Sequence, residues 1–574
     1  MVTASEIRQK YLDFFKKRGH TVIPSAPLVP ENDPTTLFTG SGMQPMLPYL
    51  LGQPYPQGIT RIVDSQKCFR AQDIDEVGDN RHDTFFEMLG NWSLGDYFKD
   101  EQQAWIWEFF TKELNLDPRK LYVSVFEGND QVSRDVEAAN NWQKLGVSPD
   151  HIFYYGVAKN WWARSSYASM PIGEPGGPDS EIFYEFTEIE HDPKFGKACH
   201  PNCDCGRFME IGNNVFMTYQ KTQNGFEPLA KKNIDFGGGL ERITAAVNND
   251  PDIFKTDLFS SIIENLGGEI NPKTRIIADH IKASVFLIAD GILPGNKAQG
   301  YFLRRLLRRA MVKMQDHLPL NIVDAVIKTY SQTSYFQDTN NDLIKQTVAD
   351  ENDKFDKTLY DGLKKLGEVS AFDLYQSYGF PLEIIEELYQ EKGLKLNKEE
   401  FTAARAKHQE ESRTASKGMF KGGLVDQSEI TTKYHTATHL LHASLRKILG
   451  DHVQQKGSNI TAERLRFDFS HSQKLSENEI KKIQNLINEK IDANLPVVKK
   501  EMQKSQALSE GAMAFFPEKY PEVTSVYSIG DFSKELCGGP HVNSTGEIGH
   551  IMITKEESAG SGIRRIYATA IFKK

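Results

Sequence analysis

Two pairs of potential metal ligands in the last third of the chain restrict its fold more than any other feature. His435 and His439 lie in YHTATHLLHASL, and Cys537 and His541 lie in ELCGGPHV about a hundred residues later. Residues i and i+4 share one side of a helix, and glycines permit the tight turn of a metal-binding loop. The four side chains predict a two-part zinc site, although two histidines on a helix are more often not ligands. Thr436 replaces the glutamate that a zinc peptidase needs, which argues against peptidase chemistry.

The rest of the 574 residues divides into segments of different pattern, consistent with three or four domains. Residues 1–245 mix short β-like runs with Gly/Pro turns and a few helices, which predicts an α+β domain with an antiparallel sheet. Residues 246–412 carry a helical period, and residues 413–428 are polar and linker-like. Residues 429–574 alternate helices with strand-like runs. We therefore expect an α+β multidomain protein.

Charge and composition exclude several classes of protein. The net charge is −10, so a nucleic-acid partner would need a local basic patch. No apolar run reaches the roughly 18 residues of a membrane span, and the N-terminus lacks a secretory signal. The five cysteines are an odd number in such a chain, which favours thiols or metal ligands over disulfides.

A polar loop between two β-prone runs, at residues 66–98, has the features of a phosphate site. Arg70 ends the first run, and Arg81, Phe86 and Glu87 lie at or near the start of the second. An arginine at a strand end suits bidentate capture of a phosphate. A hairpin with a surface loop explains this segment alone equally well.

The second segment is NIDFGGGLERI, residues 233–243, where three glycines lead into a helix that contains Arg242. Glycines let the backbone approach a ligand closely. The pattern is neither a Walker A loop nor a dinucleotide fingerprint. Taken alone, a glycine turn before a helix is the simpler interpretation.

Together the two segments resemble motifs 2 and 3 of class II aminoacyl-tRNA synthetases. The segments VDSQKCFRAQ, FFEMLGNWSLGDYF, EIGNNVFMTYQ and GGGLERI are similar to those of alanyl-tRNA synthetases, and the resemblance covers nearly the whole chain. It implies a class II antiparallel-sheet catalytic domain and a helical domain that recognises the tRNA acceptor stem. It also implies ATP-dependent ligation of L-alanine to alanine tRNA through alanyl-adenylate, with Mg²⁺ accompanying ATP.

The resemblance also gives roles to individual residues. It implies that Arg70 holds the α-phosphate and Arg242 the terminal phosphates, both as catalytic residues. Asp235 would bind the α-ammonium of alanine. The remaining residues implied for ATP are Arg81, Phe86 and Glu87, and those for alanine are Asn213 and either Trp161 or Trp162.

One segment, ACHPNCDCGRF at residues 198–208, departs from the family pattern. It supplies Cys199, His200, Cys203 and Cys205 within seven residues. Thiols and imidazole at such spacing suit tetrahedral zinc. A second metal site and a surface loop with reduced cysteines both remain open.

The helical region contains a run of arginines in YFLRRLLRRAMVK. On a helix they form one broad basic face opposite a leucine stripe, and the resemblance implies contact with the tRNA acceptor stem. A solvated basic face is the usual alternative. The residues are Arg304, Arg305, Arg308 and Arg309.

The positions that read a G·U wobble pair in most of the family are changed here to Ala298 and Gln376. Amides can also read groove edges, so Asn296, Gln299 and Gln376 are candidate readers of the tRNA. Alanine tRNA stays the expected partner, by a recognition rule that the sequence does not give.

The metal-ligand pairs, with HVQQKGS and RLRFDFSH between them, resemble the editing domain of alanyl-tRNA synthetases. The implied reaction is hydrolysis of seryl- and glycyl-tRNA, with Zn²⁺ at the four ligands. A second site is needed because an alanine pocket excludes glycine and serine poorly. Gln455 matches a family editing residue, and Thr438 is a candidate contact for the serine hydroxyl.

We expect a cytoplasmic enzyme and, because the C-terminal module of the family does not follow the editing domain here, a monomer. The alternative is an editing-only hydrolase with an inactive synthetase domain. Arg70, Asn213, Asp235 and Arg242 argue against that alternative, because decay would be expected to lose some of them.

Overall fold

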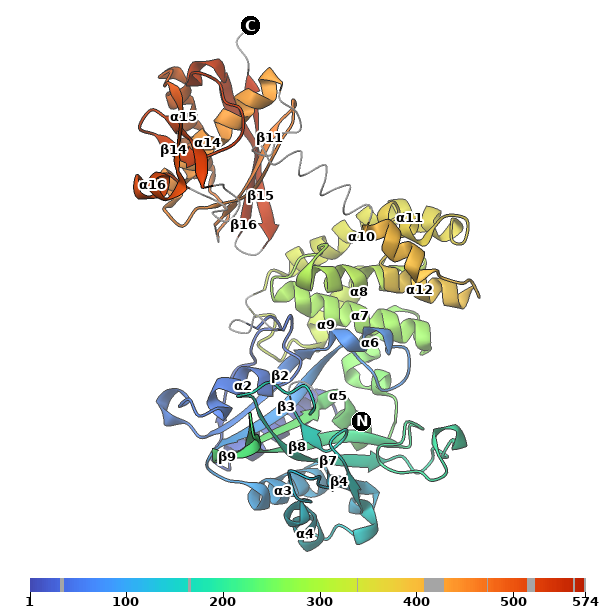
Figure 1. Ribbon diagram of the computed structural model, residues 1–574. Coiled ribbons are helices and arrows are strands. Elements are labelled where there is room, and N and C mark those ends of the chain that lie inside the picture. The colour runs from blue at the N-terminus through green and yellow to red at the C-terminus, as the bar shows by residue number, and fades with distance from the viewer. Residues whose placement is uncertain are drawn as a thin grey trace. The chain divides into compact units, whose positions relative to one another are not determined.

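The computed structural model describes residues 1–30, 36–163, 167–337, 339–406, 428–471, 473–513, 522–560 and 563–571. The chain forms two compact units, Met1–Leu396 and Asn397–Lys574, coloured blue to orange and orange to red in Figure 1. The linker expected at 413–428 lies outside the described residues except for Ser428. Across the described ranges, no helix is both long and apolar enough to cross a membrane.

The first unit is built on a nine-stranded sheet in the order β1-β2-β3-β9-β8-β7-β4-β5, with β6 paired to β7. The central neighbours, from β2 to β4, are antiparallel, and the edge pairs β1/β2 and β4/β5 are parallel. The strands are β1 Thr21–Val22, β2 Arg61–Phe69, β3 Phe85–Leu94, β4 Leu121–Phe126, β5 Ile152–Tyr155, β6 Trp161–Trp162, β7 Pro175–Glu185, β8 Phe208–Thr222 and β9 Gly225–Gly239.

Helices α1 (Ala4–Lys16) and α5 (Leu240–Val247) pack against one face of this sheet. Thr3 and Glu6 form a capping box at the start of α1. Tyr11 is fully buried, and its hydroxyl donates to Asn91 Oδ1 of β3 at 2.8 Å. On the opposite face, helix α2 (Met43–Leu50) packs against Trp92 and Val215. The rest of that face is left open to bind a ligand.

The helical part of the first unit shares one hydrophobic core with the sheet. The boundary expected near residue 245 therefore stays a prediction. The other helices of this unit are α2 Met43–Leu50, α3 Lys99–Glu108, α4 Val136–Lys144, α6 Asp257–Asn265, α7 Pro272–Ala289, α8 Ala298–Met314, α9 Asn321–Thr329, α10 Asn341–Lys364, α11 Ala371–Gln376 and α12 Leu382–Glu391.

The second unit is an α+β fold with its own core. A four-stranded antiparallel sheet in the order β10-β11-β16-β15 packs against α14 and α15, and a three-stranded sheet has the order β12-β13-β14. The elements are α14 Glu429–Leu449, β10 Gln455–Ile460, β11 Leu465–Ser470, α15 Glu477–Asp492, β12 Val497–Gln503, α16 Lys504–Ser509, β13 Val523–Ile529, β14 Ser533–Leu536, β15 His550–Gly560 and β16 Ile563–Ile571.

Candidate active and metal sites

The open face of the first sheet carries two neighbouring rows of side chains in register. Directly paired residues of adjacent strands point to the same face, as do residues two apart in one strand. The first row, from β2 to β7, is Asp64, Gly90, Gly237, Asn213 and Glu181. The second row, from β3 to β7, is Trp92, Asp235, Val215 and Asp179.

The acids in these rows are buried with few cations to balance them. Burial raises the pKa of Asp235 to about 7, although a hydrogen bond from Trp92 lowers it. Burial likewise raises the pKa of Asp179 to about 7, against hydrogen bonds from Asn160 and Asn213. Asn213 Oδ1 is buried and has no hydrogen-bond partner among the described residues. The face thus presents carboxylates and an unpaired acceptor, which suit a small cationic group.

Trp161 lies in an aromatic cluster beside this face. Its ring packs at 5.5 Å from Phe126 and at 4.8 Å from Phe226, measured between ring centroids. The indole Nε1 is buried and finds no hydrogen-bond partner in the part of the chain that the structure describes. The structure therefore places Trp161 as an apolar wall with one unused donor.

Two arginines lie at the ends of elements that border the open face. Arg70 directly follows β2, and its guanidinium carbon lies 4.9 Å from the centroid of the Phe86 ring. Arg70 and Phe69 also line a cavity of about 550 Å³. Arg242 lies in the first turn of α5, with its Nη1 3.5 Å from Glu210 Oε2.

The structure separates Glu87 from the other residues expected at the ATP site. Phe86 and Glu87 are consecutive in β3, so their side chains lie on opposite faces of the sheet. Glu87 is fully buried and binds Arg8 of α1 at 2.5 Å, Ser65 at 3.0 Å and Tyr335 at 2.7 Å. Glu87 thus anchors the helix-covered face instead of facing a ligand beside Phe86.

Arg81 lies in the loop between β2 and β3 and is partly exposed. Its Nη2 donates to the Asp204 carbonyl at 3.1 Å, and its Nε lies 3.5 Å from Asp79 Oδ2. The loop that carries Arg81 is therefore joined to the connection between β7 and β8.

The arginines of α8 do not form the continuous exposed face that the sequence suggested. Arg305 and Arg309 are only 5% and 4% exposed. Arg305 binds Asp75 at 2.5 Å, and Arg309 binds Glu387 at 2.9 Å and donates to the Ile74 carbonyl at 2.6 Å. The helical period placed these side chains correctly on one broad side, but neighbouring acids and carbonyls turn that side into an interior ion-pair layer.

The other two arginines of α8 are partly buried as well. Arg308 binds Glu351 at 2.6 Å, and Arg304 contacts Asn296 and lies 3.4 Å from Glu351. Gln376, at the end of α11, is exposed. Ala298, the first residue of α8, has a φ of 48°, a left-handed conformation that asparagine tolerates better than alanine.

The second unit brings the four expected metal ligands together. His435 and His439 project from α14, and Cys537 and His541 follow β14. Their four candidate ligand atoms all lie within 4.8 Å of one another. Burial lowers the pKa of His435 to about 3, and it lowers the pKa of His439 and of His541 below the usual value. The imidazoles are therefore neutral, as metal binding requires.

Hydrogen bonds on Nδ1 hold the rings of His435 and His541, and His439 lies beside an acidic group. His435 uses Nδ1 for the Pro540 carbonyl at 2.9 Å, and its Nε2 lies 3.4 Å from Cys537 Sγ. His541 uses Nδ1 for Thr436 Oγ1 at 3.1 Å, and its buried Nε2 has no hydrogen-bond partner within the described ranges. His439 Nδ1 lies 3.2 Å from Glu535 Oε2. Such contacts on the second ring nitrogen are typical around metal-binding histidines, so this group could hold a metal ion.

Thr438 and Gln455 complete the expected editing residues. Thr438 is buried on α14, and its hydroxyl donates to the His435 carbonyl at 2.7 Å. Gln455 begins β10, and its amide donates to Ser458 Oγ at 3.1 Å.

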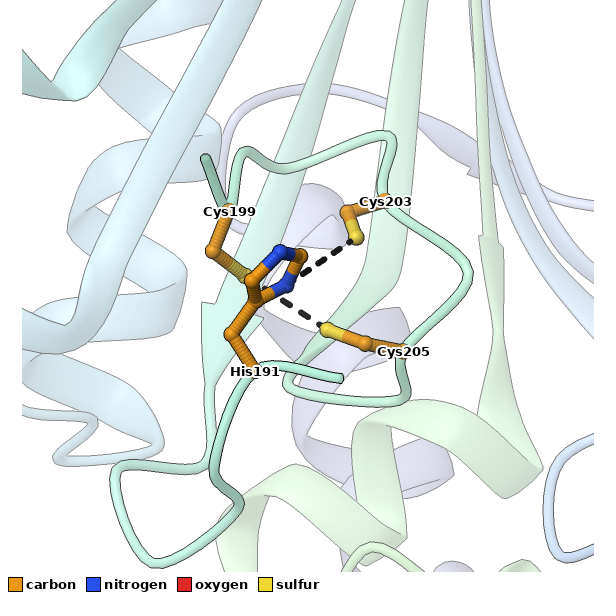
Figure 2. Close-up of side chains that lie close together, drawn as sticks. All are labelled: His191, Cys199, Cys203 and Cys205. Carbon is orange, nitrogen blue, oxygen red and sulfur yellow. Dashed lines mark hydrogen bonds between the residues drawn. The ribbon is translucent and has the colours of Figure 1, made fainter. Parts of the chain in front are cut away.

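A second cluster, in the connection between β7 and β8, contains Cys199, Cys203 and Cys205 together with His191 (Figure 2). His200, the histidine inside the cysteine-rich segment, instead lies 2.9 Å from the Tyr155 hydroxyl through its Nδ1. The sequence reasoning missed His191 because it lies eight residues before the first cysteine. A histidine just outside a cysteine-rich segment is a signal that could have found it.

Comparisons with known proteins agree on one family. The family described as "tRNA synthetases class II (A)" matches residues 6–464. An alanine–tRNA ligase of Treponema denticola is 48% identical over 99% of both chains. The chain belongs to the alanyl-tRNA synthetase family, in class II. The expected α+β class II architecture is thereby confirmed, and the "Threonyl and Alanyl tRNA synthetase second additional domain" matches residues 524–567.

Two further relatives cover the chain almost completely. An alanine–tRNA ligase of Treponema pallidum is 44% identical over 99% of this chain and 98% of that protein. One of Thermotoga maritima is 36% identical over 100% of this chain and 80% of that protein. A solved apo histidyl-tRNA synthetase of S. aureus has a TM-score of only 0.27 at 13% identity, covering 42% of this chain and 65% of that chain.

Proposed function

We propose that the first unit ligates L-alanine to alanine tRNA through an alanyl-adenylate, as the names of the relatives suggest. The observation that carries the proposal is the open sheet face, where Asp235 lies beside the unpaired Asn213 Oδ1 in neighbouring strands. A small amino acid would bind there with its ammonium against the carboxylate and its methyl group against Trp161.

The chemistry needs charge stabilisation more than proton transfer. An oxygen of the alanine carboxylate attacks the α-phosphorus of ATP, and the bond to pyrophosphate breaks. Arg70 would hold the α-phosphate and Arg242 the terminal phosphates, so that both meet the charge that develops in the transition state. Phe86 would stack on adenine, and Arg81 would hold a phosphate from the loop side. Glu87 would support the site from the opposite face through Arg8.

Mg²⁺ would enter with ATP and help to neutralise the charge of its phosphates. The ribose hydroxyl at the tRNA end then attacks the alanyl carbonyl, and AMP leaves. We propose that residues 1–245 carry both steps and that residues 246–412 bind the acceptor stem. Within that region, the partly exposed Arg304 and the exposed Gln376 are better placed for an RNA contact than Arg305 and Arg309.

Charging of alanine tRNA transcripts tests this proposal. We expect the full chain to esterify labelled alanine to the tRNA. We expect Arg242→Ala to abolish this charging. Transcripts with G·U and with G·C at the third acceptor pair show whether Gln376 and its neighbours keep the usual identity rule. The proposal would be overturned if a folded enzyme charged neither transcript with alanine and also lacked pyrophosphate exchange.

We propose in addition that the second unit hydrolyses seryl- and glycyl-tRNA and uses Zn²⁺. His435, His439, Cys537 and His541 would hold the ion, which as a Lewis acid could bind or orient the substrate when present. Four protein ligands fill a tetrahedral shell, so we infer that the ion chiefly organises the pocket. Thr438 and Gln455 would contact the aminoacyl group.

Deacylation assays test the editing proposal separately. We expect seryl-tRNA to be hydrolysed by the wild type but not by Cys537→Ala, while Arg242→Ala keeps the activity. If Arg242→Ala and the wild type both deacylate but neither charges tRNA, the chain is an editing-only hydrolase. If Cys537→Ala deacylates as fast as the wild type, the proposed editing site is wrong.

A further inference from the structure

We propose that His191, Cys199, Cys203 and Cys205 bind one structural zinc ion in the first unit, separate from the four ligands of the second unit. The cluster lies in the connection between β7 and β8, residues 186–207, which contains only one short 3-10 helix. Figure 2 shows the three thiols converging on the His191 ring. All four ligand atoms lie within 4.8 Å of one another.

Two of the separations between ligand atoms agree with a tetrahedral site, and the others are at most 4.8 Å. Zinc–sulfur bonds of about 2.3 Å and zinc–nitrogen bonds of about 2.0 Å place neighbouring ligand atoms about 3.5–3.8 Å apart in a tetrahedron. Cys199 Sγ and Cys205 Sγ lie 3.5 Å apart, and Cys203 Sγ lies 3.7 Å from His191 Nδ1. Three cysteines and one histidine are a common ligand set for structural zinc.

Surrounding contacts select the ligand atoms. His191 Nε2 lies 2.9 Å from the Gly196 carbonyl and donates to it, so Nδ1 keeps its lone pair toward the thiols. The Cys203 N–H donates to the His200 carbonyl at 2.8 Å, which closes the turn between the first two thiols. His200 itself is held by Tyr155 and lies outside the ligand set.

The ion would also fix a group of the proposed ATP site. Asp204 lies between Cys203 and Cys205, and its carbonyl accepts the hydrogen bond from Arg81. Holding both flanking cysteines on one ion therefore sets the position of that carbonyl. This second consequence rests on the proposed function, whereas metal binding does not.

Metal analysis of purified full-length protein tests the site without any activity assay. We expect two zinc ions in the wild type and one in Cys537→Ala/His541→Ala. One ion should also remain in Cys199→Ser/Cys205→Ser, because the second unit keeps its ligands. His191→Ala should lose the zinc ion of the first unit, whereas the matched control His200→Ala should keep both zinc ions.

Cobalt replacement covers the case in which a variant fails to fold. In Cys537→Ala/His541→Ala loaded with Co²⁺, three thiolates should give an intense thiolate-to-cobalt charge-transfer band, which a site without thiolates lacks. The proposal would be overturned if the wild type held one zinc ion and Cys537→Ala/His541→Ala held none. So would an intact mass showing a Cys199–Cys205 disulfide in the purified protein.

The KM for ATP in pyrophosphate exchange tests whether the ion supports the hydrogen bond between Arg81 and Asp204. Loss of the His191 ligand should raise this KM by about two- to tenfold, which corresponds to the loss of one hydrogen bond. The same substitution on an Arg81→Ala background should raise it no further. An equal effect on both backgrounds would remove the link to Arg81 but leave the zinc site standing.

Discussion

The indole Nε1 of Trp92 donates to Asp235 Oδ1 at 2.5 Å, across the paired strands β3 and β9. This bond holds a buried carboxylate on the open face of the sheet, at the place proposed for the alanine ammonium. Burial raises the pKa of Asp235 to about 7 despite the bond. The protonation of this side chain should therefore govern alanine binding near neutral pH.

The KM for alanine should fall as the pH rises from 6 to 8. Below pH 7 Asp235 is protonated and binds an ammonium weakly, and above pH 7 it is ionised. The limiting slope is about tenfold per pH unit on the acid side. Asp179, whose pKa burial also raises to about 7, acts in the same direction. Pyrophosphate exchange measures the profile, and a flat alanine KM between pH 6 and 8 would contradict it.

Trp92→Phe should move this pH profile to higher pH. The substitution removes the donor that stabilises the ionised carboxylate, and a hydrogen bond to a charged group contributes about 1.5–3 kcal/mol. Trp142→Phe is the matched control, since Trp142 is equally buried and its Nε1 donates to Ser180 Oγ at 2.9 Å. If the two variants give the same alanine profile, Trp92 has no special role beyond packing.

Removing one partner of the Arg8–Glu87 pair should destabilise the first unit. The pair is buried, with side-chain exposures of 12% and 0%, and truncating one partner of such a pair costs about 3–5 kcal/mol. Urea unfolding of Glu87→Leu should show this loss, and Arg8→Met/Glu87→Leu should recover much of it. A single variant as stable as the wild type would show that the pair does not anchor α1.

Thr436→Val should weaken zinc binding in the second unit by about 10- to 100-fold, because Thr436 holds His541 through Nδ1. Thr438→Val is the matched control, since its hydroxyl bonds only within the helix to the His435 carbonyl among the contacts described. Competition with a chelator measures both affinities. Equal affinities in the two variants would rule out the orienting role of Thr436.

The sequence predicts which residues share a site better than it predicts how deeply their side chains are buried. The spacing of His435 and His439 on a helix, and the glycines beside Cys537, led to the cluster that the structure contains. For Arg305 and Arg309 the helical period predicted a common side, but their partners Asp75 and Glu387 lie far away in the sequence. The helical period alone cannot show whether such a side of a helix faces solvent or packs against acidic residues.

Two further cases show where the local sequence pattern was insufficient or was not fully used. The alternation of a strand already places Phe86 and Glu87 on opposite faces, so their separation could have been predicted. Its position just outside the cysteine-rich segment could have made His191 a candidate, but could not favour it over His200, because a 3-10 turn and a glycine loop bring His191 back to the cysteines. Loop paths of this kind depend on tertiary contacts that a local pattern does not contain.

Amino-acid-dependent ATP–pyrophosphate exchange by the purified full chain tests the central claim most directly. We predict exchange that depends on alanine, is weaker with glycine and serine, and is lost in Asp235→Ala and Arg242→Ala while both variants keep the wild-type unfolding transition. Exchange that is absent with a folded wild type, or that survives in Asp235→Ala with an unchanged alanine KM, would contradict the proposed aminoacylation site.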